Sequence, residues 1–155
     1  MPGLIVIGYD GSVDSRRAVA AARALDADRA LVVNVWKPSL AVGTPPVPMG
    51  GGPVLPTPGD DERLEAAARE TAEEGTALAL EAGVAAEPIL VRGASAGEIG
   101  KHLAALAQER DATAIVVGRR GVSRLEAVVL GSVSDATVRE AHCPVLVVPA
   151  PDEDE

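Results

Sequence analysis

The sequence predicts an α/β fold of the doubly wound kind, a three-layer sandwich in which a parallel sheet is covered by helices on both faces. Short apolar runs alternate with helical segments along the 155 residues. The apolar runs are continuous rather than alternating with polar residues, which is typical of strands buried on both sides. The length supports one well-buried core. We therefore expect a single domain over residues 1–150 and an acidic tail at residues 151–155.

The first expected elements are a strand, a helix and a second strand. Residues 4–8 form an apolar run that ends at the turn-like cluster 9–12. Ser12 is of a residue type that caps helix N-termini, so a helix is expected to follow it. Helical spacing places three apolar residues on one face of that helix: Ala18, Ala22 and Leu25. Residues 30–35 form the next strand.

A shift in composition follows the second strand. Seven of the 12 prolines lie between Pro38 and Pro58, together with the glycine triplet at residues 50–52. Because proline removes backbone donors and glycine raises the entropy of the unfolded chain, regular structure is not expected here. We predict a long Pro/Gly-rich loop inside the domain at about residues 37–60. Loops of this length are usually disordered or functional, and a lid over a ligand is the second interpretation.

One helix is expected before a third strand and another after it. The acidic residues 60–62 favour a helix start, Gly83 favours its end, and residues 88–91 read as the strand. Ser95 and Glu98 match the capping box S-x-x-E, which opens the next helix. The apolar residues at helical spacing in these two helices are Leu64, Ala68, Ala72, Leu78, Ala79, Ile99, Leu103 and Leu106.

The strongest functional signal is a glycine-rich loop between the fourth strand and the last helix. Residues 114–117 read as that strand, the helix begins near Ser132, and residues 144–149 read as a fifth strand. The loop is marked by three glycines: Gly118, Gly121 and Gly131. Such a loop brings bare N–H groups close to a ligand, and the helix N-terminus adds about half a positive charge, so the place favours phosphate. The alternative is that the glycines only make turns.

Residues at the strand ends have the chemistry to bind a nucleotide. Asp10 can accept hydrogen bonds from ribose hydroxyls, or it can close an Asp-Gly turn. The Val35 backbone can read an adenine edge, or Val35 can be an ordinary core residue. Ser132 and Ser134 either contact phosphate or cap the helix, and Ser132-x-x-Asp135 resembles a capping box. Three arginines of the loop can supply a positive field, namely Arg119, Arg120 and Arg124, although Arg124 can equally be a solvated surface residue.

Composition excludes several classes of function. The net charge is −9 and there is no basic stripe, so nucleic acid is not an expected partner. One cysteine, Cys143, excludes an internal disulfide and a thiolate-rich metal site. No apolar run approaches the length of a membrane span, and the N-terminus has no basic leader. We expect no membrane association and a cytoplasmic location.

With these features the chain resembles the universal stress protein family over essentially its whole length. The resemblance rests on Gly118-x2-Gly121-x9-Gly131-Ser132, on Asp10 after the first strand, and on the closing run 143–148. In that family the glycine pattern marks the ATP-binding members, so the resemblance implies ATP as the ligand, with Mg²⁺. It also implies a Rossmann-like, adenine nucleotide-binding fold with a five-stranded parallel sheet in the order 3-2-1-4-5.

The same resemblance implies a role for individual residues. Asp10 would bind adenosine, with Gly8 and Tyr9 beside it, and Val35 would hold adenine through its backbone. The residues implied around the phosphates and ribose are Val117, Gly118, Arg120, Gly121, Gly131, Ser132, Val133 and Ser134. Members commonly form homodimers by pairing their last strands, here residues 145–148. The paired arginines at 119 and 120 depart from the family pattern, in which a smaller polar residue is frequent.

Three hypotheses for function follow. The leading one is an ATP-binding regulatory protein that acts as a homodimer in stress responses, with at most slow hydrolysis, because no base to activate water is evident. The second is an enzyme of the ATP-pyrophosphatase type, since residues 10–15 partly match the loop S-G-G-x-D-S. That match fails at Asp10 and Ser12. The third is a dimeric interaction module without nucleotide function.

Overall fold

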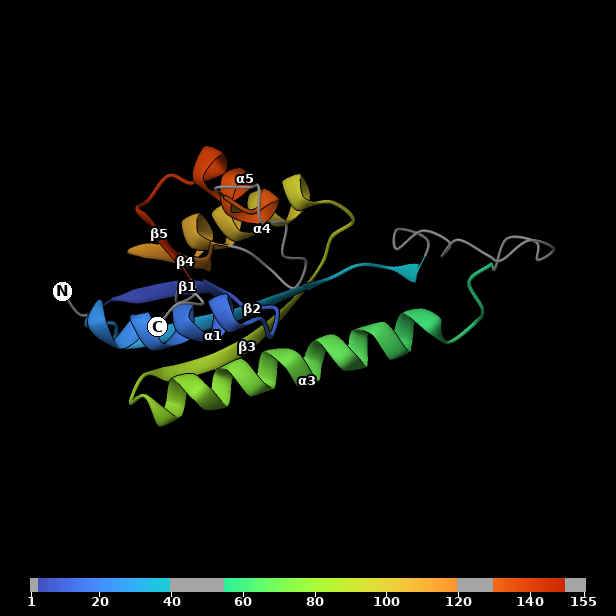
Figure 1. The fold of residues 1–155 in the computed structure, drawn as a ribbon, viewed down its shortest axis with the longest axis horizontal. Coiled ribbons are helices and arrows are strands. Elements are labelled where there is room, and N and C mark those ends of the chain that lie inside the picture. The colour runs from blue at the N-terminus through green and yellow to red at the C-terminus, as the bar shows by residue number, and fades with distance from the viewer. Residues whose placement is uncertain (1–2, 40–54, 120–129, 150–155) are drawn as a thin grey trace, which may run out of the picture.

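The computed structural model describes residues 3–39, 55–119 and 130–149 (Figure 1). The elements in these ranges are β1 (Leu4–Gly8), α1 (Val13–Ala24), β2 (Arg29–Trp36), α3 (Asp60–Glu81), β3 (Ala85–Arg92), α4 (Ala96–Glu109), β4 (Ala114–Gly118), α5 (Ser132–Glu140) and β5 (Val145–Val148). Most of the predicted Pro/Gly-rich loop, the middle of the glycine-rich loop with Arg120 and Gly121, and the acidic tail lie outside the described residues.

The strands form one parallel sheet in the order β3-β2-β1-β4-β5, which confirms the predicted fold class. The chain winds outward from β1 to β3, returns to place β4 on the other side of β1, and ends at β5. Helices α1 and α3 cover one face of the sheet and α4 and α5 cover the other (Figure 1). The strand order therefore reverses between β1 and β4, where doubly wound folds bind ligands.

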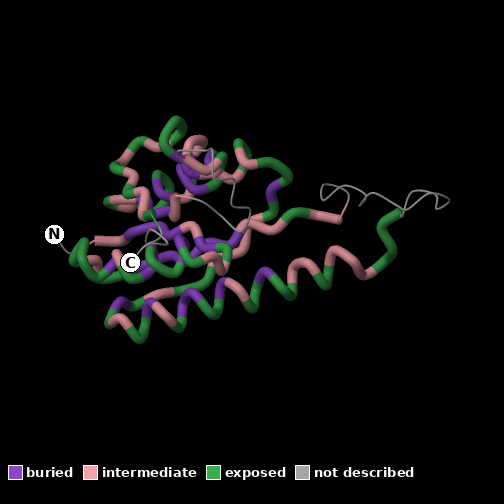
Figure 2. The backbone as a smooth tube through the Cα atoms, viewed as in Figure 1, coloured by how far each residue is buried: buried purple, intermediate pink, exposed green. Residues whose placement is uncertain are grey.

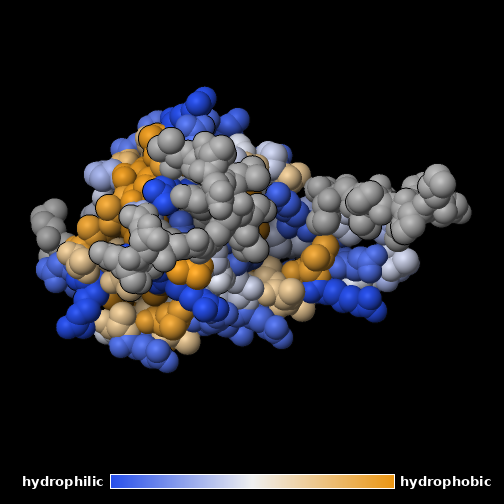
Figure 3. All heavy atoms as spheres, viewed as in Figure 1, coloured by the Kyte–Doolittle hydropathy of each residue, from blue (hydrophilic) through white to orange (hydrophobic). Residues whose placement is uncertain are grey.

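The core consists of two apolar layers divided by the sheet. Alternate residues of β1 point to opposite faces, so that Ile5 and Ile7 pack toward α1 and α3 while Val6 packs toward α4. The buried faces of α1, α3 and α4 are rich in alanine, which lets these helices lie close to the sheet (Figure 2). Hydrophilic residues line the outer side of α3, as expected for an amphipathic helix (Figure 3).

Some predicted element bounds and faces need correction. The third strand extends over Ala85–Arg92 and contains Pro88, which an edge strand tolerates because one side of its backbone has no partner strand. Leu25 is 38% exposed rather than buried. It is the C-cap of α1, so it lies past the last helical residue and off the packed face. Ile99 and Leu106 are half-buried, whereas Leu103 is fully buried.

The predicted helix starts at Ser12 and Ser95 are confirmed. The Ser12 hydroxyl accepts a hydrogen bond from the Ser15 N–H at 3.2 Å. Ser95 and Glu98 form the reciprocal capping box, with each side chain bonded to the other's backbone N–H. Among the described residues, no helix is long and apolar enough to cross a membrane.

Candidate functional site

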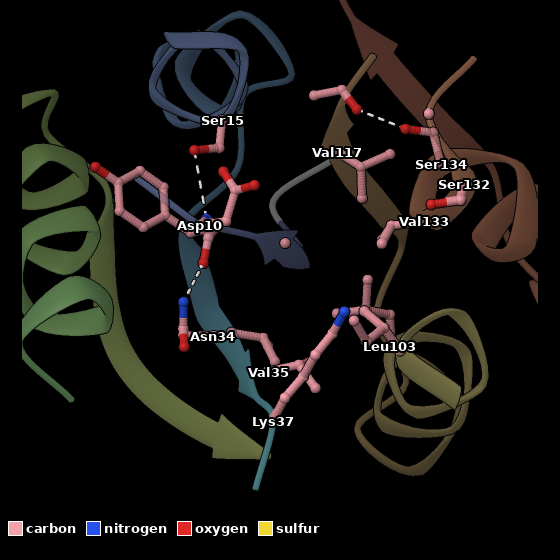
Figure 4. A pocket seen from close by; sticks show the side chains of 16 residues that line it. Asp10, Ser15, Asn34, Val35, Lys37, Leu103, Val117, Ser132, Val133 and Ser134 are labelled. Carbon is pink, nitrogen blue, oxygen red and sulfur yellow. Dashed lines mark hydrogen bonds between the residues drawn. The ribbon is translucent and has the colours of Figure 1, made fainter. Parts of the chain in front are cut away.

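A cleft of about 380 Å³ lies at the carboxyl ends of β1, β2 and β4, where the strand order reverses (Figure 4). Its size falls within the range of small-molecule sites. The predicted site residues that line it are Gly8, Tyr9, Asp10, Val35, Val117, Gly118, Gly131, Ser132, Val133 and Ser134. The other two predicted residues, Arg120 and Gly121, lie outside the described residues. The cleft thus brings together residues from both halves of the sequence.

The turn between β1 and α1 is closed by its own side chains. A carboxylate oxygen of Asp10 accepts a hydrogen bond from the Ser12 N–H at 3.0 Å, and the Ser15 hydroxyl accepts one from the Asp10 N–H at 3.4 Å. The Ser12 cap occupies the Ser15 N–H. Asp10 therefore does make the local turn that was one of its two interpretations, and its carboxylate is at the same time exposed at the cleft.

The side chain of Tyr9 is engaged with α3. Tyr9 is 2% exposed, its phenol donates a hydrogen bond to Glu74 at 2.8 Å, and Arg16 pairs with the same carboxylate at 2.8 Å. Burial of the phenol and its bond to Glu74 raise the pKa of Tyr9. The Tyr9 carbonyl faces the other way and accepts a hydrogen bond from the Asn34 side chain at 2.8 Å. Tyr9 thus connects the end of β1, which lines the cleft, to α3.

The backbone of Val35 faces the space beyond the end of β1. In a strand, the N–H and C=O of successive residues point alternately to the two neighbouring strands. The Val33 carbonyl accepts from the Tyr9 N–H, so Val33 faces β1, and the Trp36 carbonyl accepts from the Gly93 N–H, so Trp36 faces β3. Val35, two residues after Val33, faces the β1 side, where the pairing with β1 has already ended at Gly8. Its polar backbone groups point toward the cleft.

Helix α5 presents its N-terminus to the cleft without a side-chain cap. Its N-cap is Gly131, and Ser132 is the first helical residue, which corrects the interpretation of Ser132 as the cap. The first helical hydrogen bond runs from the Asp135 N–H to the Gly131 carbonyl. No acceptor within residues 3–39, 55–119 and 130–149 meets the N–H groups of residues 132–134. These are the donors that an anion at a helix N-terminus uses.

The two serines of α5 have different surroundings. The buried Ser134 hydroxyl contacts the carbonyls of Gly118 and Arg119 at 2.6 and 3.1 Å, so it holds the end of β4 against the start of α5. The Ser132 side chain is exposed at the cleft (Figure 4). Ser134 is therefore a structural side chain and Ser132 is accessible to a ligand.

Close packing explains one glycine of the motif. A Cβ atom on Gly118 would lie 2.6 Å from the Cβ of Asp14 and 3.0 Å from the Ser15 backbone nitrogen. The approach of α1 to β4 therefore requires glycine at this position, whether or not a ligand is bound. Gly8 is also tight, since a Cβ there would lie 3.1 Å from Val117.

Sequence reasoning did not assign six cleft-lining residues to the site: Ser15, Val33, Asn34, Lys37, Ile99 and Leu103. Asn34 and Lys37 flank Val35 at the end of β2, so the argument that selected Val35 extends to them. Ile99 and Leu103 were expected to face inward, and they do: Leu103 is fully buried and Ile99 half-buried, and both also form an apolar wall of the cleft. An apolar wall beside open backbone groups fits a flat base, and the start of α5 fits a phosphate. Among the described residues, no cluster of metal-binding side chains occurs.

Comparison with known proteins identifies relatives along the whole chain. Residues 1–149 match the universal stress protein family. A universal stress protein from Thermus aquaticus is 35% identical over 147 residues, covering 93% of this chain and 96% of that protein. Universal stress protein YxiE from Bacillus subtilis is 43% identical over 76 residues, 49% of each chain. The chain thus matches nearly all of the first relative and about half the length of the second.

Solved structures superpose on this fold. A universal stress protein in complex with cAMP has a TM-score of 0.65 at 25% identity, covering 97% of this chain and 98% of that chain. The hypothetical protein MJ0577 has a TM-score of 0.73 at 20% identity, covering 99% of each chain. These matches agree with the five-stranded parallel architecture derived above.

Proposed function

The chain belongs to the universal stress protein family, and on that premise we propose that its cleft binds an adenine nucleotide, with Mg²⁺-ATP as the ligand. The protein acts as a nucleotide-dependent regulator in stress responses, in the cytoplasm and as a homodimer, rather than as a dedicated enzyme. The bound cAMP of a relative at 25% identity supports the ligand class.

The observation that carries the proposal is the pairing of two open backbone features across one cleft. The Val35 N–H and C=O face the cleft from β2, and the uncapped N-terminus of α5 faces it from β4. An adenine edge offers a donor and an acceptor that match a backbone pair, and a phosphate matches the N–H groups at residues 132–134. Asp10 lies at the end of β1, between them, where it accepts hydrogen bonds from the ribose. Arg120 and Gly121 are proposed to complete the phosphate site.

The homodimer proposal rests on the edge of the sheet. Strand β5 is the last strand in the sheet order, and Leu146 is 37% exposed on it. An apolar edge strand is stabilised by pairing with a second copy of itself, which removes the open edge. Substitution of Leu146 by Lys is expected to convert the dimer to a monomer in light scattering, with the circular dichroism spectrum unchanged.

The turn between β1 and α1 weighs against the pyrophosphatase alternative. That reaction needs backbone N–H groups open to pyrophosphate, but the N–H groups of Ser12 and Ser15 are bonded to side chains of the same turn. The interaction-module alternative predicts a folded dimer without nucleotide affinity.

Calorimetric titration of Mg²⁺-ATP into the native chain tests the proposal, with Mg²⁺-GTP as the comparison ligand. We expect saturable binding at one nucleotide per chain with a Kd of about 1 μM, which corresponds to about −8 kcal/mol, and weaker binding of GTP. Absence of binding by folded protein would overturn the proposed function and leave the interaction module.

A further inference from the structure

Lys37 places a positive charge in the cleft that the sequence motif does not include. It follows Trp36, the last residue of β2, and its side chain reaches along the cleft past Val35 toward Leu103 (Figure 4). Among the described residues that line the cleft, Lys37 is the one cationic side chain, and Asp10 carries a carboxylate. The Lys37 ammonium makes no ion pair or hydrogen bond within the part of the chain that the structure describes.

Two other described cations near this edge of the sheet, Arg16 and Arg92, are already engaged. Arg16 pairs with Glu74 at 2.8 Å, and Arg92 lies 3.8 Å from a carboxylate oxygen of Asp61 and 5.7 Å from the ring centre of Trp36. Arg119 does not line the cleft. Lys37 is therefore available to a ligand, whereas Arg16 and Arg92 would have to exchange existing contacts.

Because the protein carries a net negative charge, a cation in the cleft would favour the binding of an anionic ligand. The net charge is −9, so an anionic ligand is repelled unless a local cation compensates. The N-terminus of α5 supplies only a partial charge, and a full charge from Lys37 would add to that of Arg120, which is proposed to complete the phosphate site. Lysine carries a full charge at the end of a flexible side chain. The Lys37 side chain can therefore extend from β2 toward a phosphate held on the other side of the cleft.

We propose that Lys37 pairs with the phosphate charge of the bound nucleotide, from the β2 side of the cleft opposite α5, and thereby selects phosphorylated adenine ligands over the nucleoside. This inference rests on the proposed nucleotide function. Lys37, which lies outside the glycine motif, would then discriminate adenosine from its phosphorylated forms.

The chain contains two lysines, which supply a matched pair of variants. Lys37→Met and Lys101→Met remove the same charge from exposed positions, and Lys101 lies on α4 outside the cleft. Both are expected to fold normally, which circular dichroism checks. Each variant and the native chain are titrated calorimetrically with adenosine, AMP and Mg²⁺-ATP, at low and at physiological ionic strength.

We expect Lys37→Met to weaken AMP and ATP binding by about threefold to tenfold at low salt, as for an exposed charge pair. Its affinity for adenosine is expected to equal that of the native chain. Raising the salt concentration is expected to narrow the difference for AMP and ATP, since the contribution is electrostatic. Lys101→Met is expected to bind all three ligands as the native chain does.

Each other outcome overturns a distinct statement. Native binding with unchanged Lys37→Met affinities would overturn the role of Lys37 and leave the proposed function intact. Equal loss for adenosine, AMP and ATP would show a contact with the base or ribose and overturn the phosphate pairing. Equal losses in Lys37→Met and Lys101→Met would show a non-specific effect of net charge. Absence of any binding by the native chain would overturn the proposed function, and this inference with it.

Discussion

Two helices begin at the same edge of the sheet, after the neighbouring strands β1 and β4, yet their N-termini differ. Helix α1 starts after a short turn; the Ser12 side chain caps it by accepting from the Ser15 N–H, and Asp10 accepts from the N–H of Ser12 itself. Helix α5 starts after a long loop, its N-cap is Gly131, and no side chain of the described residues caps it. Both helices carry the same dipole, so the dipole alone does not define an anion site. The difference teaches that the side-chain cap matters: α1 has one, and α5 has none among the described residues.

The largest expected effect on stability comes from the tightest contact between the end of β4 and the start of α1. Gly118→Ala would place a Cβ 2.6 Å from the Cβ of Asp14 and 2.9 Å from the Asp14 carbonyl carbon, and backbone atoms cannot move aside cheaply. We expect the free energy of unfolding to fall by about 1–3 kcal/mol, measured by urea denaturation. Gly97→Ala is the control, because its nearest neighbour would be 3.9 Å away. Equal stability of the two variants would show that the close approach of α1 to β4 is wrong.

The two serines of α5 separate structural from ligand roles. Ser134→Ala removes a buried hydroxyl that contacts the carbonyls of Gly118 and Arg119, so we expect a loss of about 1–2 kcal/mol of stability. Ser132→Ala alters an exposed side chain at the cleft, so stability is expected to stay unchanged while ATP affinity falls. Urea denaturation and calorimetry measure the two quantities. The reverse pattern would contradict the assignment.

For Ser12, the cap of α1, we expect the opposite of Ser132: a loss of stability with little change in ATP affinity. Ser12→Ala removes the acceptor of the Ser15 N–H and is expected to cost about 1 kcal/mol of stability. The affinity for ATP is expected to stay close to that of the native chain, because α1 is closed to the ligand by its own turn. A large loss of ATP affinity in this variant, with stability unchanged, would show that α1 rather than α5 holds the phosphate.

The smallest expected effect on stability is pH-dependent and comes from Tyr9, which directly follows β1. Burial and the bond to Glu74 raise the pKa of the phenol above 10.0. This contribution to stability is therefore fully present below pH 10.0 and is lost as the pH rises further, since the unfolded chain ionises first. Tyr9 is the one tyrosine of the chain, so its ultraviolet absorbance follows the titration directly. A midpoint at or below 10.0 would contradict the buried hydrogen bond.

Part of this architecture could be predicted because it follows from local patterns. Continuous apolar runs predicted parallel strands, and parallel strands end at one edge, so Asp10 and Gly118 were expected to converge. Both residues line the cleft in the structure. The serine caps Ser12 and Ser95 were also predictable, since residue type and spacing decide them.

The remainder depends on contacts between distant segments. Ser132 has the residue type of a cap, but Ser134 bonds to the carbonyls at the end of β4 and the helix starts with Gly131 as its cap. Asn34 and Lys37 line the cleft because β2 runs on past the end of β1, a difference in strand length that no local pattern reveals.

A ¹⁵N–¹H NMR titration of the native chain with Mg²⁺-ATP tests most directly whether α5 rather than α1 receives the phosphate. We expect the largest amide shifts at residues 131–134 and at Val35, with small shifts at residues 13–15. Larger shifts at residues 13–15 than at 131–134, or none at either helix, would contradict this expectation.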